Sequence, residues 1–215
     1  MQLSLGPSFA PAGELALGPD AVLLRGLALA DADRLATALA EVVAAAPFRH
    51  MCTPGGHRMS VAMSNCGALG WTSDAGGYRY TTVDPATGRA WPAMPEALRE
   101  LARRAAATAG FPGFEPDACL VNRYAPTARM TLHQDRNERD LGAPIVSVSL
   151  GLPAVFLFGG DTREARPTRV PLAHGDVVVW GGASRLRYHG ILPLTAGHHP
   201  QIGPWRINLT FRRAG

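Results

Sequence analysis

The spacing of apolar residues changes along the chain, and the change falls near Gly110. Before it, two segments repeat apolar residues at helical intervals. They read "ADRLATALAEVVAAA" (32–46) and "PEALRELARRAAATAG" (95–110). Asp31 precedes the first as an N-cap and Pro47 ends it, whereas Pro95 opens the second and Gly110 stops it. The pattern predicts two amphipathic helices.

After Gly110 the apolar residues come in short runs separated by Gly, Pro and Asp. The runs are "ACLVNRY" (118–124), "PIVSVSLG" (144–151), "AVFLFGG" (154–160), "TRVPLA" (168–173), "DVVVWGG" (176–182) and "RINLTFRR" (206–213). Short strands at regular spacing predict a sandwich or barrel. With an earlier strand at 21–26, the sequence favours a mainly β, α+β fold with both helices outside one sheet.

The length and the remaining segments indicate one domain. A chain of 215 residues suits a single catalytic unit over 1–215, with residues 118–213 as its core. Residues 50–94 form a β-like insertion between the helices. Residues 1–19 are rich in Pro, Gly and Ala, and we expect them to be loose.

Composition limits the surroundings and partners of the protein. Its three cysteines form no C-x-x-C pair, which favours a reducing compartment. The N-terminus lacks the pattern of a signal peptide, and charged residues interrupt the apolar stretch from Ala21. We therefore expect a cytoplasmic protein with no membrane span. The net charge of +4 permits a polyanionic partner such as nucleic acid.

The stretch "TLHQDRN" (131–137) places an imidazole and a carboxylate two residues apart. On a strand, His133 and Asp135 share a face and can bind one metal ion together. His174 and Asp176 repeat the spacing, but Gly175 between them indicates a turn. A third ligand must come from another histidine. His189, after the Trp180 strand, is placed best, and His50, His57, His198 and His199 stay open.

Two histidines and a carboxylate suit Fe(II), although Zn or Cu would bind the same groups. The last strand supplies a second feature. Its side chains on one face are Arg206, Asn208, Thr210 and Arg212. Two inward arginines need an anion, and a dicarboxylate such as 2-oxoglutarate meets that need. Asn122 and Tyr124 could add neutral hydrogen bonds, whereas a solvated edge strand is the alternative.

Together these stretches resemble the AlkB family of Fe(II)/2-oxoglutarate-dependent nucleic-acid dealkylases. The matching segments are "APFRHM", "TPGGHRMSVAMSNCGALGWT", "WPAMP", "PDACLVNRYAP", "LHQDRNERDLGAPIVSVSLGLPAVFLFGG", "HGDVVVWGGASRLRYHGI" and "RINLTFR". The resemblance covers nearly everything after residue 20. It implies a double-stranded β-helix, or jelly-roll, with a nucleotide-recognition lid over residues 50–94.

The resemblance also implies residue roles. It implies that the iron ligands are His133, Asp135 and His189. It also implies that 2-oxoglutarate is bound by Asn122, Tyr124, Arg206 and Arg212, with Asn208 close by. The implied contacts to the damaged nucleotide are Trp71, Tyr78, Tyr80 and Arg163. A flipped base needs a flat partner, which Trp71 or the His133 ring offers, although without the resemblance ordinary packing within a hairpin is the favoured explanation of Trp71, Tyr78 and Tyr80.

One position departs from the family pattern. The family usually reads H-x-D-x-D, with the second acid touching the base, and this chain has Asn137 there. An amide can still hydrogen-bond an exocyclic amine, but it lacks the charge that attracts a cationic methylated base. We therefore expect a weakened or altered base preference with the iron chemistry intact.

The activity implied is the oxidative demethylation of bases such as 1-methyladenine and 3-methylcytosine. Fe(II), 2-oxoglutarate and O₂ are used, and formaldehyde, succinate and CO₂ are released. The expected partner is alkylated DNA, single- or double-stranded, with RNA left open, and we expect a monomer. Two rival functions remain: an oxygenase for a protein or small molecule, and a catalytically silent nucleic-acid-binding jelly-roll.

Overall fold

Two antiparallel sheets form the body of the protein. The computed structural model describes residues 13–215. The larger sheet has the order β1 (Glu14–Gly18), β2 (Ala21–Leu24), β11 (Val177–Trp180), β8 (Ile145–Gly151), β13 (Arg206–Arg212), β6 (Ala118–Tyr124) and β3 (Ala62–Gly67). The smaller has the order β10 (Thr168–Leu172), β9 (Ala154–Phe158), β12 (His189–Ile191) and β7 (Met130–His133). Side chains of both sheets share one apolar cluster, so the sheets face each other.

Strands β6 to β13 pass back and forth between the two sheets. β6, β8, β11 and β13 belong to the larger sheet, and β7, β9, β10 and β12 to the smaller. Pairing within each sheet is antiparallel throughout. This alternation of strands between two facing sheets is the jelly-roll topology, and it confirms the predicted fold class.

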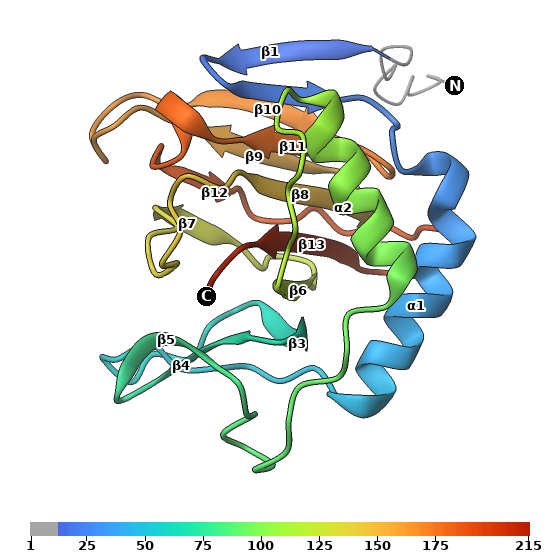
Figure 1. Ribbon diagram of the computed structural model, residues 1–215, viewed down its shortest axis with the longest axis vertical. Helices are drawn as coiled ribbons and strands as arrows, with labels where there is room; N and C mark the ends of the chain where they lie inside the picture. The colour runs from blue at the N-terminus through green and yellow to red at the C-terminus, as the bar shows by residue number, and fades with distance from the viewer. Residues whose placement is uncertain (1–12) are drawn as a thin grey trace, which may run out of the picture.

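Two helices cover the outer face of the larger sheet (Figure 1). Helix α1 (Ala32–Ala45) and helix α2 (Glu96–Thr108) bury one apolar stripe each, represented by Leu35 and Leu98. They pack on alternate side chains of β13, whose Leu209 is fully buried. The opposite face of β13 is left for polar residues, and this two-sided strand is what positions the site.

The N-terminal part is more ordered than its composition indicated. Residues 14–18 form β1, which pairs with β2 at the edge of the larger sheet. The prediction of a loose segment over 1–19 is wrong for these residues, because Leu15 and Ala16 pair with β2 and Leu17 packs against the apolar cluster that both sheets share. The rest of that prediction, residues 1–12, lies outside the described residues.

Two smaller differences from the predicted elements concern the N-terminus of α1 and two short strands. Asp31 stands at the N-cap of α1, but its side chain makes no capping hydrogen bond and pairs with Arg104 of α2 instead. Strand β12 was not predicted, because a run of three residues is too short for a periodic signal, and β7 ends at His133, before the Asp135 that the same strand was expected to carry.

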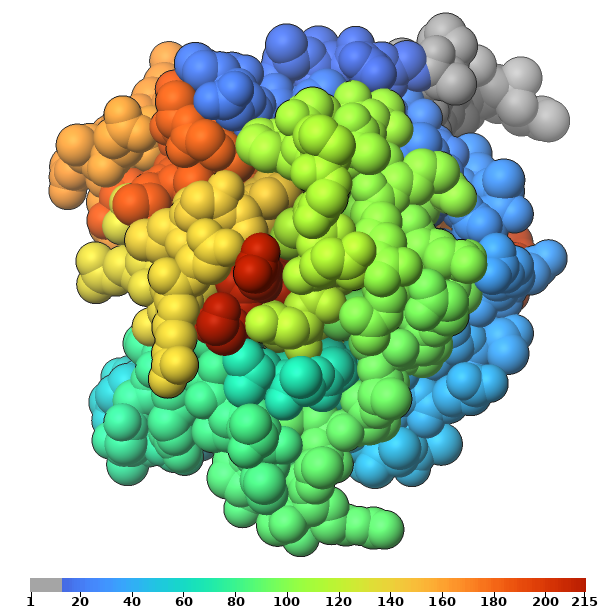
Figure 2. Space-filling model, viewed as in Figure 1, coloured from blue at the N-terminus to red at the C-terminus, as the bar shows by residue number. Residues whose placement is uncertain are grey.

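Residues 50–94 divide between the sheet and a projecting hairpin. β3 pairs along its length with β6. Strands β4 (Gly70–Asp74) and β5 (Gly77–Thr81) form a separate two-stranded hairpin, visible at the lower left of Figure 1. Figure 2 shows the C-terminal residues between the loop after β7 and this region of the chain. Within residues 13–215, neither α1 nor α2 is long and apolar enough to cross a membrane.

Candidate active site

Three side chains meet where β7 and β12 run side by side. His189 at the start of β12 lies directly opposite His133 at the end of β7. The strand ends at His133, yet Asp135 still turns toward both rings. Its carboxylate oxygens lie 3.6 Å from His133 Nε2 and 3.7 Å from His189 Nε2. The three ligand atoms lie within 4.8 Å of one another, and no other such group occurs among residues 13–215.

Backbone contacts orient both imidazoles toward the aspartate. His133 Nδ1 lies 2.8 Å from the Thr131 carbonyl, and His189 Nδ1 lies 3.0 Å from the Arg187 carbonyl. A carbonyl only accepts, so each Nδ1 carries the hydrogen and each Nε2 keeps its lone pair free. This is the arrangement that a metal-binding histidine needs.

The protonation states also suit a metal. Burial, followed by the nearby His189 ring, lowers the pKa of His133 to about 4. Burial by itself would raise the pKa of Asp135, but the Arg212 guanidinium and the two histidines hold that pKa well below its usual range. At neutral pH the site therefore presents a neutral imidazole at His133 and an ionised carboxylate at Asp135, the donor forms that bind a divalent cation.

Arg206 is a buried cation with free hydrogen-bond donors. It is 1% exposed, and its Nη2 donates to Ser149 Oγ at 2.9 Å, whereas Nε and Nη1 have no protein partner. Burial lowers its pKa, opposed by the neighbouring Tyr124. A buried guanidinium with two orphaned donors is costly unless an anion joins it. A carboxylate reached through the cavity would satisfy both donors at once.

Polar side chains continue along β13 from Arg206 toward the three ligands. Asn208 donates to Ser147 Oγ at 2.8 Å and accepts from Thr210 at 2.9 Å. Arg212 pairs with Asp135 Oδ2 at 2.5 Å. The two arginines of the strand thus differ. Arg206 has hydrogen-bond donors without a protein partner, whereas Arg212 pairs with the candidate metal ligand Asp135. Together they fit a dicarboxylate with one end at Arg206 and its other end near the metal.

The site opens into a cavity of about 870 Å³ between the jelly-roll and the hairpin. Trp71 and Tyr78 of the hairpin line it, with ring centroids 5.6 Å apart and planes inclined by 17°. Exposed arginines stand around it: Arg58, Arg129, Arg136 and Arg163. The cavity therefore combines a flat aromatic surface with positive charge, which suits a base attached to a phosphate backbone.

The structure brings nearly all of the sequence-predicted site residues to this cavity. It is lined by Trp71, Tyr78, Asn122, Tyr124, His133, Asp135, Asn137, Arg163, His189, Arg206, Asn208 and Arg212. Tyr80 is not among its lining residues, and its hydroxyl donates to Glu138 at 2.6 Å. Sequence reasoning missed Ser149, Glu138 and Arg185. Of these three, only Ser149 could have been found from the sequence. It is a polar residue in the largely apolar strand "IVSVSLG", on the face that contacts Arg206.

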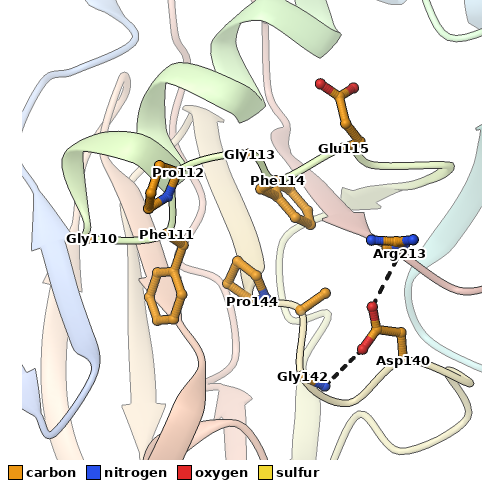
Figure 3. A pocket seen from close by; sticks show the side chains of 11 residues that line it. Gly110, Phe111, Pro112, Gly113, Phe114, Glu115, Asp140, Gly142, Pro144 and Arg213 are labelled. Carbon is orange, nitrogen blue, oxygen red and sulfur yellow. Dashed lines mark hydrogen bonds and ion pairs between the residues drawn. The ribbon is translucent and has the colours of Figure 1, made fainter.

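A second cleft lies on the outer surface, between the loop after α2 and the loop after β7 (Figure 3). Its volume is about 360 Å³, and Phe111 and Pro144 line it. Asp140 already pairs with Arg213 and accepts from Gly142 N–H there. With its charges paired and no histidine or cysteine among its lining residues, this cleft offers no comparable chemistry.

Known proteins share both the sequence and the architecture. Residues 20–212 match the family model of the 2OG-Fe(II) oxygenase superfamily. The chain is 58% identical over 199 residues to the alpha-ketoglutarate-dependent dioxygenase AlkB of Escherichia coli K12, covering 93% of this chain and 92% of that protein. It is 37% identical over 98 residues to the nucleic acid dioxygenase ALKBH1 of Mus musculus, covering 46% and 25%. The solved structure of OsALKBH1 superposes with a TM-score of 0.81 at 27% identity, covering 94% of this chain and 100% of that one.

Proposed function

The chain belongs to the 2OG-Fe(II) oxygenase superfamily, and from that membership we propose that it demethylates alkylated bases in DNA through the site at His133, Asp135 and His189. The enzyme is a dioxygenase that uses Fe(II), 2-oxoglutarate and O₂. The observation that carries the proposal is Arg206. Its two unpaired donors lie in the same cavity as three convergent metal-ligand side chains.

The chain's own residues divide the work. His133, Asp135 and His189 would hold the iron, and Asn122, Tyr124, Arg206 and Arg212 would bind 2-oxoglutarate, with Asn208 close by; Arg206, beside Tyr124, would take the carboxylate far from the iron. When bound, Fe(II) and 2-oxoglutarate would supply the O₂-dependent hydroxylation of the N-methyl carbon, with formaldehyde, succinate and CO₂ as products. Arg212 keeps Asp135 ionised and oriented while the metal site is loaded.

The hairpin and the cavity mouth recognise the base. The methyl group lies on the pairing edge of the base, so the base must leave the helical stack to reach the iron. Trp71, stacked on Tyr78, supplies a flat surface for the flipped base, and Arg163 and Arg136 stand where phosphates would follow. Asn137 faces the same cavity and would hydrogen-bond the exocyclic amine without adding charge.

The same reasoning extends to organisation and location. We propose one catalytic domain over residues 1–215, with the core at 118–213 and the lid at 50–94, acting as a monomer in the cytoplasm. The three cysteines Cys52, Cys66 and Cys119 are all free, which accords with a reducing compartment. RNA remains a second substrate because single strands offer the same unpaired bases.

Mass spectrometry of methylated oligonucleotides tests the activity. We expect loss of one methyl group from 1-methyladenine and 3-methylcytosine with equal amounts of formaldehyde and succinate. Omission of iron or 2-oxoglutarate should abolish the change. Succinate formed at the same rate with and without a methylated oligonucleotide would indicate the rival oxygenase for another substrate. No succinate from any substrate would indicate the silent binding protein.

A further inference from the structure

A buried carboxylate that the proposed mechanism does not use lies behind the metal-ligand side chains. Glu138 is in the loop after β7, and its side chain is 2% exposed. Tyr80 of the hairpin donates to its Oε1 at 2.6 Å, and Arg185 donates to its Oε2 at 3.1 Å. Arg212 Nε lies 3.4 Å from Oε1. This buried carboxylate thus has two hydrogen-bond donors and one further ion pair, from three separate parts of the chain, which is the pairing that a buried charge requires.

The same arginines also hold Asp135. Arg212 donates to Asp135 Oδ2 from Nε at 3.0 Å and from Nη2 at 2.5 Å. Arg185 donates to the main-chain carbonyl of Asp135 at 2.7 Å and is 3% exposed. Two arginines and two carboxylates thus form one charge-balanced cluster, in which Asp135 faces the histidines and Glu138 faces the hairpin.

From these contacts, and resting on the proposed function, we propose that Glu138 is a positioning residue that couples the hairpin to the metal site. Arg212 Nε lies between the two carboxylates, 3.0 Å from Asp135 Oδ2 and 3.4 Å from Glu138 Oε1. A stronger attraction of Arg212 to Glu138 therefore weakens its interaction with Asp135. Tyr80 binds the same oxygen of Glu138 that faces Arg212 Nε. A shift of the hairpin when a nucleic acid binds changes the Tyr80 contact, and the change passes through Glu138 and Arg212 to Asp135.

Removing the charge of Glu138 tests the first step. In Glu138→Gln, Arg212 has Asp135 as its one remaining anionic partner and competes more strongly with a metal for that carboxylate. Partners of metal ligands typically change metal affinity by about 10–100-fold when mutated, and we expect a weakening of about tenfold for Co(II). The readout is the Co(II) titration of metal-free protein, followed by the visible absorption of the bound ion. Glu115→Gln, which removes a carboxylate from an exposed pair with Arg103, is the matched control.

Removing one oxygen from the hairpin tests the second step. Tyr80→Phe keeps every charge of the cluster but removes one hydrogen bond to Oε1 of Glu138, so we expect Co(II) affinity without nucleic acid to shift by about fivefold at most, less than in Glu138→Gln. In wild type, a single-stranded oligonucleotide containing 1-methyladenine should change the Co(II) spectrum or affinity. In Tyr80→Phe that change should disappear even at oligonucleotide concentrations that saturate the variant.

The outcomes separate this inference from the activity itself. Unaltered Co(II) affinity and spectrum in folded Glu138→Gln, or an undiminished oligonucleotide effect in Tyr80→Phe, would overturn the coupling. So would a wild-type protein whose Co(II) spectrum and affinity ignore the oligonucleotide. Circular dichroism establishes folding, and if Glu138→Gln does not fold, the Tyr80→Phe comparison decides. Failure of demethylation leaves the Co(II) titrations readable, because they require no turnover.

Discussion

Two His-x-Asp segments of the chain have the same spacing and opposite fates. His133 and His189 bring their ring centroids within 4.4 Å, and Asp135 lies beside both. His174 stacks on His199 at 4.2 Å, but Asp176 turns elsewhere. Its carboxylate accepts hydrogen bonds from Arg25, Gly26 N–H and Ala173 N–H. His133 and Asp135 line a polar cavity, whereas Asp176 stabilises a turn.

The residue between the histidine and the aspartate explains the difference. Gly175 has φ +84°, a conformation that glycine adopts without strain, and it reverses the chain into β11. Gln134 follows the last residue of β7 and is not among the residues with positive φ, and its amide donates to the Leu186 carbonyl. Spacing therefore identifies candidate ligands, and the backbone conformation decides whether their side chains converge.

The largest expected effect comes from removing one histidine of each pair. In His133→Ala two ligands remain, too few to hold iron, and we expect activity at or below about 1% of wild type. His174→Ala should keep activity within about twofold because it touches neither cavity nor ligand. Formaldehyde release and metal content of the purified variants provide the measurement. Equal losses in the two variants would show that the first pair is not the metal site.

The two aspartates should separate stability from metal binding. Asp176→Ala leaves Arg25 and two backbone N–H groups without their buried acceptor, and we expect the free energy of unfolding to fall by about 2–4 kcal/mol. Co(II) binding of the folded fraction should be unchanged. Asp135→Ala should instead abolish Co(II) binding. Urea unfolding and metal titration of both variants check this, and loss of Co(II) binding in folded Asp176→Ala would contradict it.

A smaller difference concerns how the stability of the protein depends on pH. Burial, followed by His199, lowers the pKa of His174, and burial, followed by His198, lowers that of His199. The unfolded chain then binds more protons once pH falls below about 6.5, so the stability contributed by this pair is present above that pH and lost below it. We expect the loss to stay below about 1 kcal/mol, since both rings are partly exposed. Urea unfolding of wild type and His199→Asn on either side of that pH measures it; identical pH slopes would exclude the stacked pair as the cause.

A change in base preference is expected at Asn137, two residues beyond the aspartate of the first segment. Asn137 is exposed at the cavity, where an added carboxylate would attract a cationic methylated base. We expect Asn137→Asp to raise rates on 1-methyladenine and 3-methylcytosine about fivefold, equivalent to about 1 kcal/mol in a partly solvated site. An uncharged methylated base serves as the control. Unchanged rates and base ratios would show that the amide does not weaken selection.

The sequence predicted those parts of the molecule in which apolar and polar residues alternate at the period of a strand or a helix. The alternation along 206–212 placed Arg206 and Arg212 on one face and Leu209 on the other, because one side of that strand is a core and the other a cavity. Similar periodicity predicted both helices and a sandwich or barrel, and the family resemblance specified the jelly-roll. Such patterns are strong because each apolar residue on the buried face contributes to stability.

Other features had no periodic signal. Glu138 stands within "DRNERD", where a buried carboxylate is indistinguishable from a solvated one. Its burial depends on Arg185 and Arg212, which come from distant parts of the chain. The direction of Tyr80 likewise depends on which face of a two-sided hairpin meets the jelly-roll. Long-range pairing of charges leaves no local trace in the order of residues.

The orphaned donors of Arg206 have a consequence for how long the protein survives in a cell. A dicarboxylate that neutralises this guanidinium binds the native chain and not the unfolded one, so by mass action it protects the fold in proportion to its concentration. Starvation for the co-substrate would then shorten the lifetime of the enzyme as well as slow it, and abundant succinate, with the same two charged ends, would preserve the protein while blocking its work.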